Sequence, residues 1–246
     1  MSNCILFIVS IVVDLSLGTL SIEDSITQIP FPSSEDFLTR PSGRPFTITV
    51  QGNVGAGKST LLNFFKDYPD ISVYKEPLEI WQNLSGKNFL ELVYQDQSRW
   101  GMTFQSLVTL TMLEIHLADR RKEGSKFKPV KVMERSVHSA RHCFAEQLKP
   151  LMTSEEMMVL DSWYRELEDR QEFDVDVDLI VYLRTSPNIA MARVKNRNRH
   201  EENSIPLEYF QKLHQLHEEW LVYKNSSSFA SKKSLPPVAF TLSILN

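Results

Sequence analysis

Residues 52–59 read Gly-Asn-Val-Gly-Ala-Gly-Lys-Ser, which matches the phosphate-loop pattern Gly-x4-Gly-Lys-Ser/Thr at every fixed position. The β-branched run FTITV at 46–50 precedes the loop and a helical pattern follows it, which is the context that the motif requires. The glycines let backbone N–H groups curve around phosphate oxygens, and the start of the next helix adds partial positive charge. We therefore expect a nucleoside triphosphate to be bound by Gly52, Asn53, Val54, Gly55, Ala56, Gly57, Lys58, Ser59 and Thr60.

Two side chains of this loop have predicted roles of their own. In such a loop the lysine, here Lys58, reaches the β- and γ-phosphates, and the hydroxyl of Ser59 is a ligand for Mg²⁺. The alternative is a glycine-rich turn between a strand and a helix, with a lysine on the surface. The complete motif in its proper context favours the phosphate site, with ATP and Mg²⁺ as the expected cofactors.

Short apolar segments alternate with helical ones after the loop. The runs SVY at 72–74, VKVM at 130–133 and DLIVYL at 178–183 are each followed by a segment with helical spacing. The clearest helical patterns cover 103–121 and 206–222. This alternation predicts an α/β fold in which helices cover both faces of a parallel sheet.

The composition is that of an ordinary globular protein. The chain has 246 residues, of which 42% are hydrophobic and 24% are charged, and this length suits one sizeable domain. A net charge of −4 argues against a nucleic-acid partner, because non-specific binding to nucleic acid needs a basic surface. Cys4 and Cys143 lie far apart, so we expect no disulfide framework and a reducing compartment.

The two ends of the chain differ from the middle in amino-acid composition. Residues 4–13 are almost purely apolar, but ten residues are too few to span a bilayer as a helix. No basic residue precedes them, and acidic residues follow, so neither a signal peptide nor a mitochondrial presequence fits. We expect an irregular leader over 1–44, one folded domain over 45–222 and an atypical tail over 223–246. No membrane partner is expected, and the location is expected to be intracellular, with the cytoplasm and the mitochondrion both left open.

Carboxylates follow two of the predicted strands. Because the carboxyl ends of parallel strands face the ligand crevice, Glu134 is a candidate for holding Mg²⁺ and Arg135 for facing the transferred charge. Glu76 follows the second strand, where a carboxylate can accept the proton of an attacking hydroxyl. A salt bridge at a strand end and an ordinary loop glutamate remain the alternatives. The chain has no NKxD-type segment, which argues against a guanine-specific GTPase.

Basic residues gather in the segment RVKNRNR at 193–199. Arg193 and Arg197 are four residues apart and share a helix face, and Arg199 follows. Phosphoryl transfer needs cations that close over the γ-phosphate, and a mobile helical lid can supply them. The alternative is a solvated basic face, but the phosphate loop favours a lid.

Seven segments in the same order carry a resemblance to a known family. They read GNVGAGKST, KEPLEIWQN, YQDQSRWGMTFQSLVTLTML, MERSVHSARHCF, DLIVYLRTSP, RNRHEEN and IPLEYFQKLHQLHEEWL. Over about residues 45–222 the chain resembles the deoxyribonucleoside kinases, especially the branch of mitochondrial thymidine kinase and insect deoxynucleoside kinase. The resemblance implies a P-loop nucleoside-kinase fold with a helical lid, a homodimer, and salvage of a small-molecule deoxynucleoside. In that reaction the γ-phosphate of ATP moves to the 5′-hydroxyl of a pyrimidine deoxynucleoside, thymidine or deoxycytidine, with broader use left open.

The resemblance also implies roles for individual residues. Glu76 matches the general base, and Arg135 matches the residue that contacts it and the 5′-oxygen. Gln105 matches the glutamine that pairs with the base edge, since an amide can read thymine or cytosine. Small and apolar groups at the far side of the base leave room for the 5-methyl group of thymine. The other matches are Tyr94 and Glu202 at the 3′-hydroxyl, the aromatic walls Trp81, Phe104 and Phe144, and the far-side residues Val108, Met112 and Ala140.

The chain departs from the family after the last predicted helix. Family members continue to a fifth strand that ends in Asp, then to a loop and helix that hold adenine, whereas here the chain reads YKNSSSFASKKSLPPVAFTLSILN. The run VAFTLSIL is a candidate replacement for that strand. The tail supports one alternative, a catalytically impaired variant that binds nucleoside or subunits. A second alternative is a nucleoside-monophosphate kinase, because the architecture is shared, but it would need further cations near Gln105. The histidine pairs His138/His142 and His214/His217 have no further ligands beside them, so no metal site is expected there.

Overall fold

The computed structural model describes residues 43–119, 127–225, 229, 231 and 233–242. The predicted leader 1–44 lies outside the described residues apart from its last two, as do the apolar run 4–13 and parts of the predicted tail.

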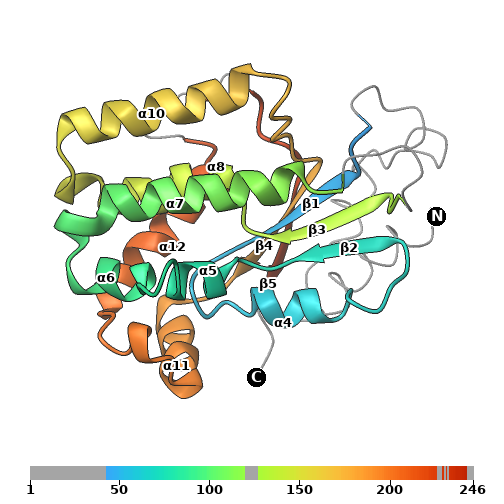
Figure 1. Ribbon diagram of the computed structural model, residues 1–246. Coiled ribbons are helices and arrows are strands. Elements are labelled where there is room, and N and C mark those ends of the chain that lie inside the picture. The colour runs from blue at the N-terminus through green and yellow to red at the C-terminus, as the bar shows by residue number, and fades with distance from the viewer. Residues whose placement is uncertain (1–42, 120–126, 226–228, 230, 232, 243–246) are drawn as a thin grey trace.

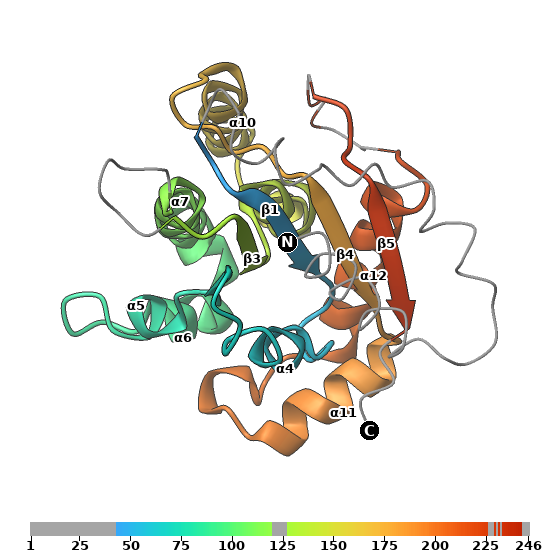
Figure 2. The ribbon, with the colours of Figure 1, turned by 90° about the vertical axis from the view of Figure 1, so that its right-hand side faces the viewer.

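The core of the molecule is a five-stranded parallel sheet with the order β2-β3-β1-β4-β5 (Figure 1). Figure 2 shows β1 in the middle of the sheet, with β3 on one side and β4 and β5 on the other. The parallel sheet predicted from the alternating pattern is therefore confirmed. The strands are β1 Phe46–Gln51, β2 Ile71–Tyr74, β3 Val130–Glu134, β4 Leu179–Arg184 and β5 Val238–Leu242.

Alternate residues of the central strands face two separate cores. Ile48 and Val181 belong to one apolar cluster, which is completed by Leu61 and Leu62 of helix α4 (Lys58–Asn63). Ile180 of β4 belongs to the other, together with Leu213 of helix α12 (Leu207–Leu221). Both faces of the sheet are thus covered, which explains why the strands read as nearly continuous apolar runs.

The longest helix among the described residues, α7, begins earlier than its periodicity predicts. The apolar pattern predicts 103–121, whereas α7 covers Gln97–Leu117. The side chain of Asp96 accepts a hydrogen bond from the backbone N–H of Arg99, so a polar N-cap starts the helix upstream of its apolar stripe. Helix α12, by contrast, begins one residue later than the predicted start at 206, with Leu207 as its first residue and Pro206 as its N-cap.

The remaining helices fill the connections between the strands. A buried lysine joins one of them to the sheet: the ammonium of Lys131 in β3 donates to the carbonyls of Ile115, His116 and Ala118 at the C-terminal end of α7. The remaining helices that connect the strands are α5 Leu78–Gln82, α6 Phe89–Gln95, α8 Val137–Ser139, a π-helix Ala140–Ala145, α9 Glu146–Leu148, a 3₁₀ turn Lys149–Leu151, α10 Ser154–Asp169, α11 Pro187–Arg197 and a 3₁₀ turn His200–Glu202.

Strand β5 comes from the C-terminal segment that departs from the family pattern. It pairs in parallel with β4, with Ile180 opposite Val238 and Arg184 opposite Leu242. Residues Val238–Leu242, the part of the apolar run VAFTLSIL that the structure describes, thus supply the edge strand of the sheet, beyond the domain boundary predicted at residue 222.

Candidate active site

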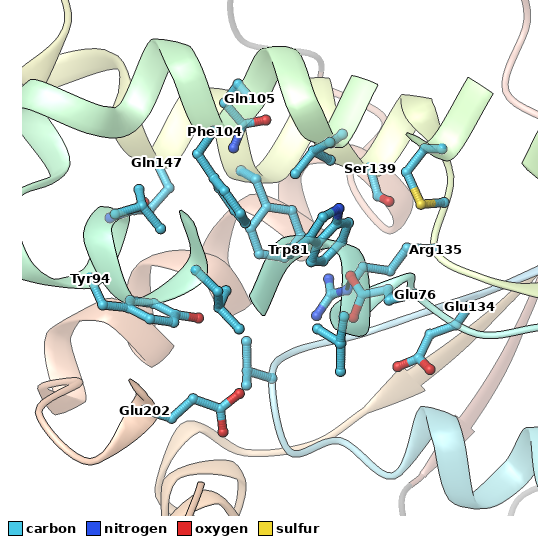
Figure 3. Close-up of a pocket in the computed structure, with 18 of the residues that line it drawn as sticks. Glu76, Trp81, Tyr94, Phe104, Gln105, Glu134, Arg135, Ser139, Gln147 and Glu202 are labelled. Carbon is cyan, nitrogen blue, oxygen red and sulfur yellow. Dashed lines mark ion pairs between the residues drawn. The ribbon is translucent and has the colours of Figure 1, made fainter. Parts of the chain in front are cut away.

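One pocket opens at the carboxyl ends of the central strands and joins the phosphate loop to a largely apolar cavity (Figure 3). The loop follows β1, Glu134 ends β3, and Glu76 follows β2. Since parallel strands present their carboxyl ends at the same edge, residues far apart in sequence meet here. The predicted residues that line the pocket are Val54, Gly55, Lys58, Ser59, Glu76, Trp81, Tyr94, Phe104, Gln105, Val108, Met112, Glu134, Arg135, Ala140, Phe144, Arg197, Arg199 and Glu202.

The phosphate loop packs so closely that two of its glycines have no room for a side chain. A Cβ on Gly52 would lie 2.7 Å from the carbonyl oxygen of Leu183, and one on Gly55 would lie 2.4 Å from that of Ala190. Both residues also have positive φ angles, which glycine adopts at little cost. The side-chain amide of Asn53 donates to the carbonyl of Phe210 at 2.8 Å, which fixes the loop against α12.

The polar side chains of the loop converge on Glu134. The ammonium of Lys58 donates to the carbonyl of Asn53 at 2.9 Å and lies 3.8 Å from Oε1 of Glu134. The hydroxyl of Ser59 donates to the same carboxylate, at 2.9 and 3.1 Å from its two oxygens. Burial, followed by the nearby charge of Arg135, lowers the pKa of Lys58 to about 8. A lysine and a hydroxyl at the start of a helix, beside a carboxylate at a strand end, fit a triphosphate with a divalent cation.

The ion pair of Glu76 and Arg135 lies beside this group. Nε of Arg135 is 2.7 Å from Oε1 of Glu76, and the guanidinium also lies 4.3 Å from the ring centroid of Phe144. Burial raises the pKa of Glu76, and the charge of Glu134 raises it too, while Arg135 opposes both. The backbone of Arg135 has a φ of 62°, an uncommon conformation for a side-chain-bearing residue. Strain of this kind is typical of functional sites.

Aromatic and apolar side chains from several helices form the rest of the pocket. Trp81 and Phe104 meet edge to face with ring centroids 5.6 Å apart, and the indole N–H of Trp81 donates to the hydroxyl of Thr111 at 3.0 Å. Gln105 is 2% exposed, and within the described residues its side-chain oxygen has no hydrogen-bond partner. A buried amide oxygen without a partner at a cavity wall is suited to accept a hydrogen bond from the polar edge of a ligand.

A tyrosine and a glutamate mark the lower rim of the pocket in Figure 3. The rings of Tyr94 and Tyr209 meet edge to face at 6.1 Å, and burial raises the pKa of Tyr94 well above its usual value. The buried carboxylate of Glu202 forms ion pairs with Arg197 at 2.5 Å and Arg199 at 2.7 Å. The rim thus joins the cavity to the cations at the end of α11.

Several predicted residues lie outside the pocket lining. Arg193 belongs to α11 but does not contribute to the lining, in contrast to Arg197 and Arg199. Thr60 is exposed on α4. The others belong to the phosphate loop but do not line the pocket: Gly52, Asn53, Ala56 and Gly57.

The pocket also contains residues that sequence reasoning missed. Gln97 is eight residues before Gln105 on α7, and Gln147 is three residues after Phe144, so helical periodicity from two predicted residues could have indicated both. Apolar and hydroxyl side chains carry no such signal. The missed residues are Leu78, Leu90, Val93, Gln97, Ser136, Ser139, Gln147, Leu148 and Tyr209.

The histidine pairs have neighbours of their own. A ring nitrogen of His138 is 2.9 Å from the carbonyl of Val175, His142 stacks on Trp220, and His217 bonds to the carbonyl of Leu213. Across the described parts of the chain, no group of three or more histidine, cysteine, aspartate or glutamate side chains could hold a metal ion. The same parts contain no helix with the length and apolar character needed to cross a bilayer.

Comparison with known proteins matches the chain to a family and to named relatives. The deoxynucleoside kinase family model matches residues 48–240. The mitochondrial thymidine kinase 2 of Macaca fascicularis is 43% identical over 211 residues, which are 85% of this chain and 72% of that protein. The human mitochondrial thymidine kinase 2 is 46% identical over 71% of this chain and 64% of its own length, so just under two thirds of that relative is spanned.

A more distant relative supports the same assignment. The deoxycytidine kinase of Mus musculus is 34% identical over 227 residues, which are 84% of this chain and 86% of that protein. The match of the family model includes the phosphate loop, Glu76, Arg135 and strand β5 up to residue 240. The chain therefore belongs to the deoxynucleoside kinase family.

Proposed function

We propose that the chain transfers the γ-phosphate of ATP to the 5′-hydroxyl of a pyrimidine deoxynucleoside, thymidine or deoxycytidine, in nucleotide salvage. The observation that carries the proposal is the ion pair of Glu76 and Arg135, because it lies between the phosphate loop and the apolar cavity of one continuous pocket. A substrate hydroxyl that reaches this ion pair from the cavity would meet the carboxylate of Glu76, which can accept its proton, on one side and the phosphate-binding groups on the other.

Glu76 is the general base in this proposal. Its pKa is raised by burial, so its affinity for a proton is greater than that of an exposed glutamate, while Arg135 favours the charged form. The carboxylate accepts the proton of the 5′-hydroxyl as the oxygen attacks phosphorus. Arg135 orients that carboxylate at 2.7 Å and faces the charge on the attacked phosphoryl group.

Lys58, Ser59 and Glu134 would hold the phosphates and Mg²⁺. Lys58 faces the β- and γ-phosphates, while the hydroxyl of Ser59 and the carboxylate of Glu134 lie where they would bind the cation or its waters. Bound Mg²⁺ supplies charge neutralisation on the transferred phosphoryl group. Arg197 and Arg199 belong to the helical lid in this proposal, because they line the pocket from the last residue of α11 and from the segment just after it. Arg193 is assigned only to the outer part of the lid.

Gln105 and the apolar walls would select the base. The side-chain oxygen of Gln105 is buried, and its amide offers both a donor and an acceptor to the base edge. Phe144 stacks on the base opposite Trp81 and Phe104, and Tyr94 with Glu202 binds the 3′-hydroxyl. The small residue Ala140, with Val108 and Met112, leaves room for a 5-methyl group and supports a preference for pyrimidines.

A homodimer and a mitochondrial or cytoplasmic location complete the proposal. Helix α10 exposes Met158, Val159 and Trp163, an apolar surface that a second subunit would cover. Two relatives are named mitochondrial, which supports the first of the two locations. Neither the impaired variant nor the nucleoside-monophosphate kinase gains support, since the named relatives are thymidine and deoxycytidine kinases.

The test is ATP- and Mg²⁺-dependent phosphorylation of thymidine, deoxycytidine, deoxyadenosine and deoxyguanosine by the purified full chain. We expect turnover of the two pyrimidine nucleosides and a loss of about 10²–10⁴-fold in kcat for Glu76→Gln. Glu79→Gln, which removes an exposed carboxylate three residues away, is the matched control and should leave kcat unchanged. A folded chain that turns over none of the four nucleosides would contradict the proposal.

A further inference from the structure

A second pair of amide side chains lines the pocket at the end away from the phosphate loop. Gln97 begins α7 and Gln147 lies in α9, and Nε2 of Gln147 donates to Oε1 of Gln97 at 3.4 Å. Both side chains are half-buried and both line the cavity. Figure 3 draws Gln147 on the side of Phe104 and Tyr94, opposite Glu134. Neither glutamine has a role among the residues proposed above.

The two glutamines meet because α7 has a glycine where it approaches the next segment. A Cβ on Gly101 would lie 3.1 Å from Cε of Met152, and 3.6 and 3.7 Å from the two Cδ atoms of Leu148. Gly101 is buried, so the backbone of α7 comes close to the chain around Gln147. A larger residue at this position would push Gln97 and Gln147 apart.

Residues at successive positions along α7 face successive atoms around the edge of the bound pyrimidine ring. Gln97, Gly101 and Gln105 follow one another at four-residue intervals and share one face, and Val108 and Met112 continue beyond Gln105. With Gln105 at the N3–C4 edge and Met112 on the side of C5, the C2 carbonyl lies on the opposite side of N3. That side corresponds to the start of α7, towards Gly101 and the two glutamines.

The C2 carbonyl of a pyrimidine can only accept a hydrogen bond, so a buried one requires a donor. The side-chain nitrogen of Gln147 has two N–H groups, and its bond to Gln97 uses one of them. The second can reach a bound base directly or through one ordered water. Gln97 supplies the acceptor that orients the amide with its nitrogen in this position.

We propose that Gln147 donates a hydrogen bond to the C2 carbonyl of the pyrimidine, directly or through one water, and that Gln97 is the positioning residue that holds it. The inference rests on the proposed function and on Gln105 at the other edge of the base. The site then reads the pyrimidine from both sides of N3, with the buried amide of Gln105 on one side and the half-buried amide of Gln147 on the other.

The experiment compares thymidine with 2-thiothymidine, in which a sulfur atom, a weaker acceptor, replaces the C2 oxygen. The full chain is measured by titration calorimetry for Kd and by turnover for kcat and KM. The variants are Gln147→Leu and Gln97→Leu, which keep the approximate size and remove the amide. Gln215→Leu is the matched control, because Gln215 is exposed and bonds to Glu219 on α12.

The unaltered chain and Gln215→Leu should bind thymidine about three- to tenfold more tightly than 2-thiothymidine, the effect of one neutral hydrogen bond. Gln147→Leu should weaken the binding of thymidine by the same factor, with a higher KM and an unchanged kcat, and should leave the binding of 2-thiothymidine nearly unchanged. Gln97→Leu should change the ratio in the same direction by less. Equal losses for the two nucleosides, or a preference that survives Gln147→Leu, would overturn the inference.

The outcomes separate this inference from the proposed function. If Gln147→Leu does not fold, Gln147→Met replaces it in the comparison. The affinities of the unaltered chain for the two nucleosides then also test the inference, and equal affinities overturn it. A chain that binds thymidine without phosphorylating it overturns the proposed function alone, since the Kd ratio still tests the C2 contact. A folded chain that binds neither nucleoside overturns both.

Discussion

The two ends of the pocket are built in different ways. The phosphate end, consisting of residues 52–60 and Glu134, comes from one continuous loop and one strand end, and its shape depends on the backbone. The nucleoside end draws Trp81, Gln105 and Phe144 from three separate helical segments, and its shape depends on how their side chains pack. Substitutions at the phosphate end should therefore have larger effects than those at the nucleoside end, where neighbouring side chains share each contact.

Among the substitutions within the two ends, the largest effect is expected from removing the charge of Lys58. Lys58→Met removes the ammonium that faces the β- and γ-phosphates, and kcat should fall about 10²–10³-fold because a donor to developing charge is lost. Steady-state kinetics with saturating thymidine measure this loss. Lys66→Met, at an exposed lysine just after α4, is the control and should retain full activity.

The next effect concerns the backbone of the loop. Gly55→Ala and Gly86→Ala introduce a methyl group at nearly equal φ angles, 78° and 80°, but only the first meets a carbonyl at 2.4 Å, while the second meets nothing within 4 Å. Both lose about 1 kcal/mol from the left-handed conformation. Gly55→Ala should lose about 2 kcal/mol more from the clash. Urea unfolding measures the difference in stability between the two variants. Equal losses of stability would show that the loop moves aside for the added methyl group at little cost.

The pH dependence of activity sharpens the comparison at the boundary between the two ends. Only ionised Glu76 can accept the proton, and burial raises its pKa, so kcat/KM should fall with decreasing pH at a higher pH than an exposed glutamate would give. Arg135 holds that pKa down, so Arg135→Met should move the acid limb to still higher pH. A pH–rate profile of both proteins is the measurement. An acid limb that does not move would remove Arg135 from this role.

The smallest effect is expected inside the nucleoside end. Thr111→Val removes the acceptor of the Trp81 indole N–H, and the unpaired buried donor should cost about 1–3 kcal/mol of stability. The KM for thymidine should rise only a few-fold, because Phe104 still packs against the indole. Thr111→Ser keeps the hydroxyl and serves as the control. A loss of activity as large as that of Lys58→Met would contradict the division between the two ends.

Local sequence signals were sufficient for the fold and for the phosphate end. The loop motif, the apolar runs and the acidic residues at the strand ends predicted four of the strands and the meeting of Lys58, Glu76 and Glu134. The segment VAFTLSIL was a candidate for the fifth strand, and its first five residues form β5. Such signals work because they concern residues adjacent in the chain or at a common sheet edge.

Contacts between distant helices could not be predicted in the same way. The contact of Gln97 with Gln147 joins residues 50 positions apart and depends on how the start of α7 packs against α9. Lys131 shows the same limit, because a lysine within an apolar strand gives no sign that it caps the end of α7. The predicted start of α7 was wrong because a polar N-cap determines where the helix begins, and apolar periodicity carries no information about such a cap.

The position of β1 in the sheet has a consequence for folding. The strand that ends in the phosphate loop is made first among the five, yet it bonds to β3 at 130–134 and to β4 at 179–184. Both pairings close long loops, and contacts of such sequence separation form slowly. During synthesis on the ribosome, the loop cannot take its final shape until the chain has been made through β4. Nucleotide binding should thus be among the last properties that the growing chain acquires.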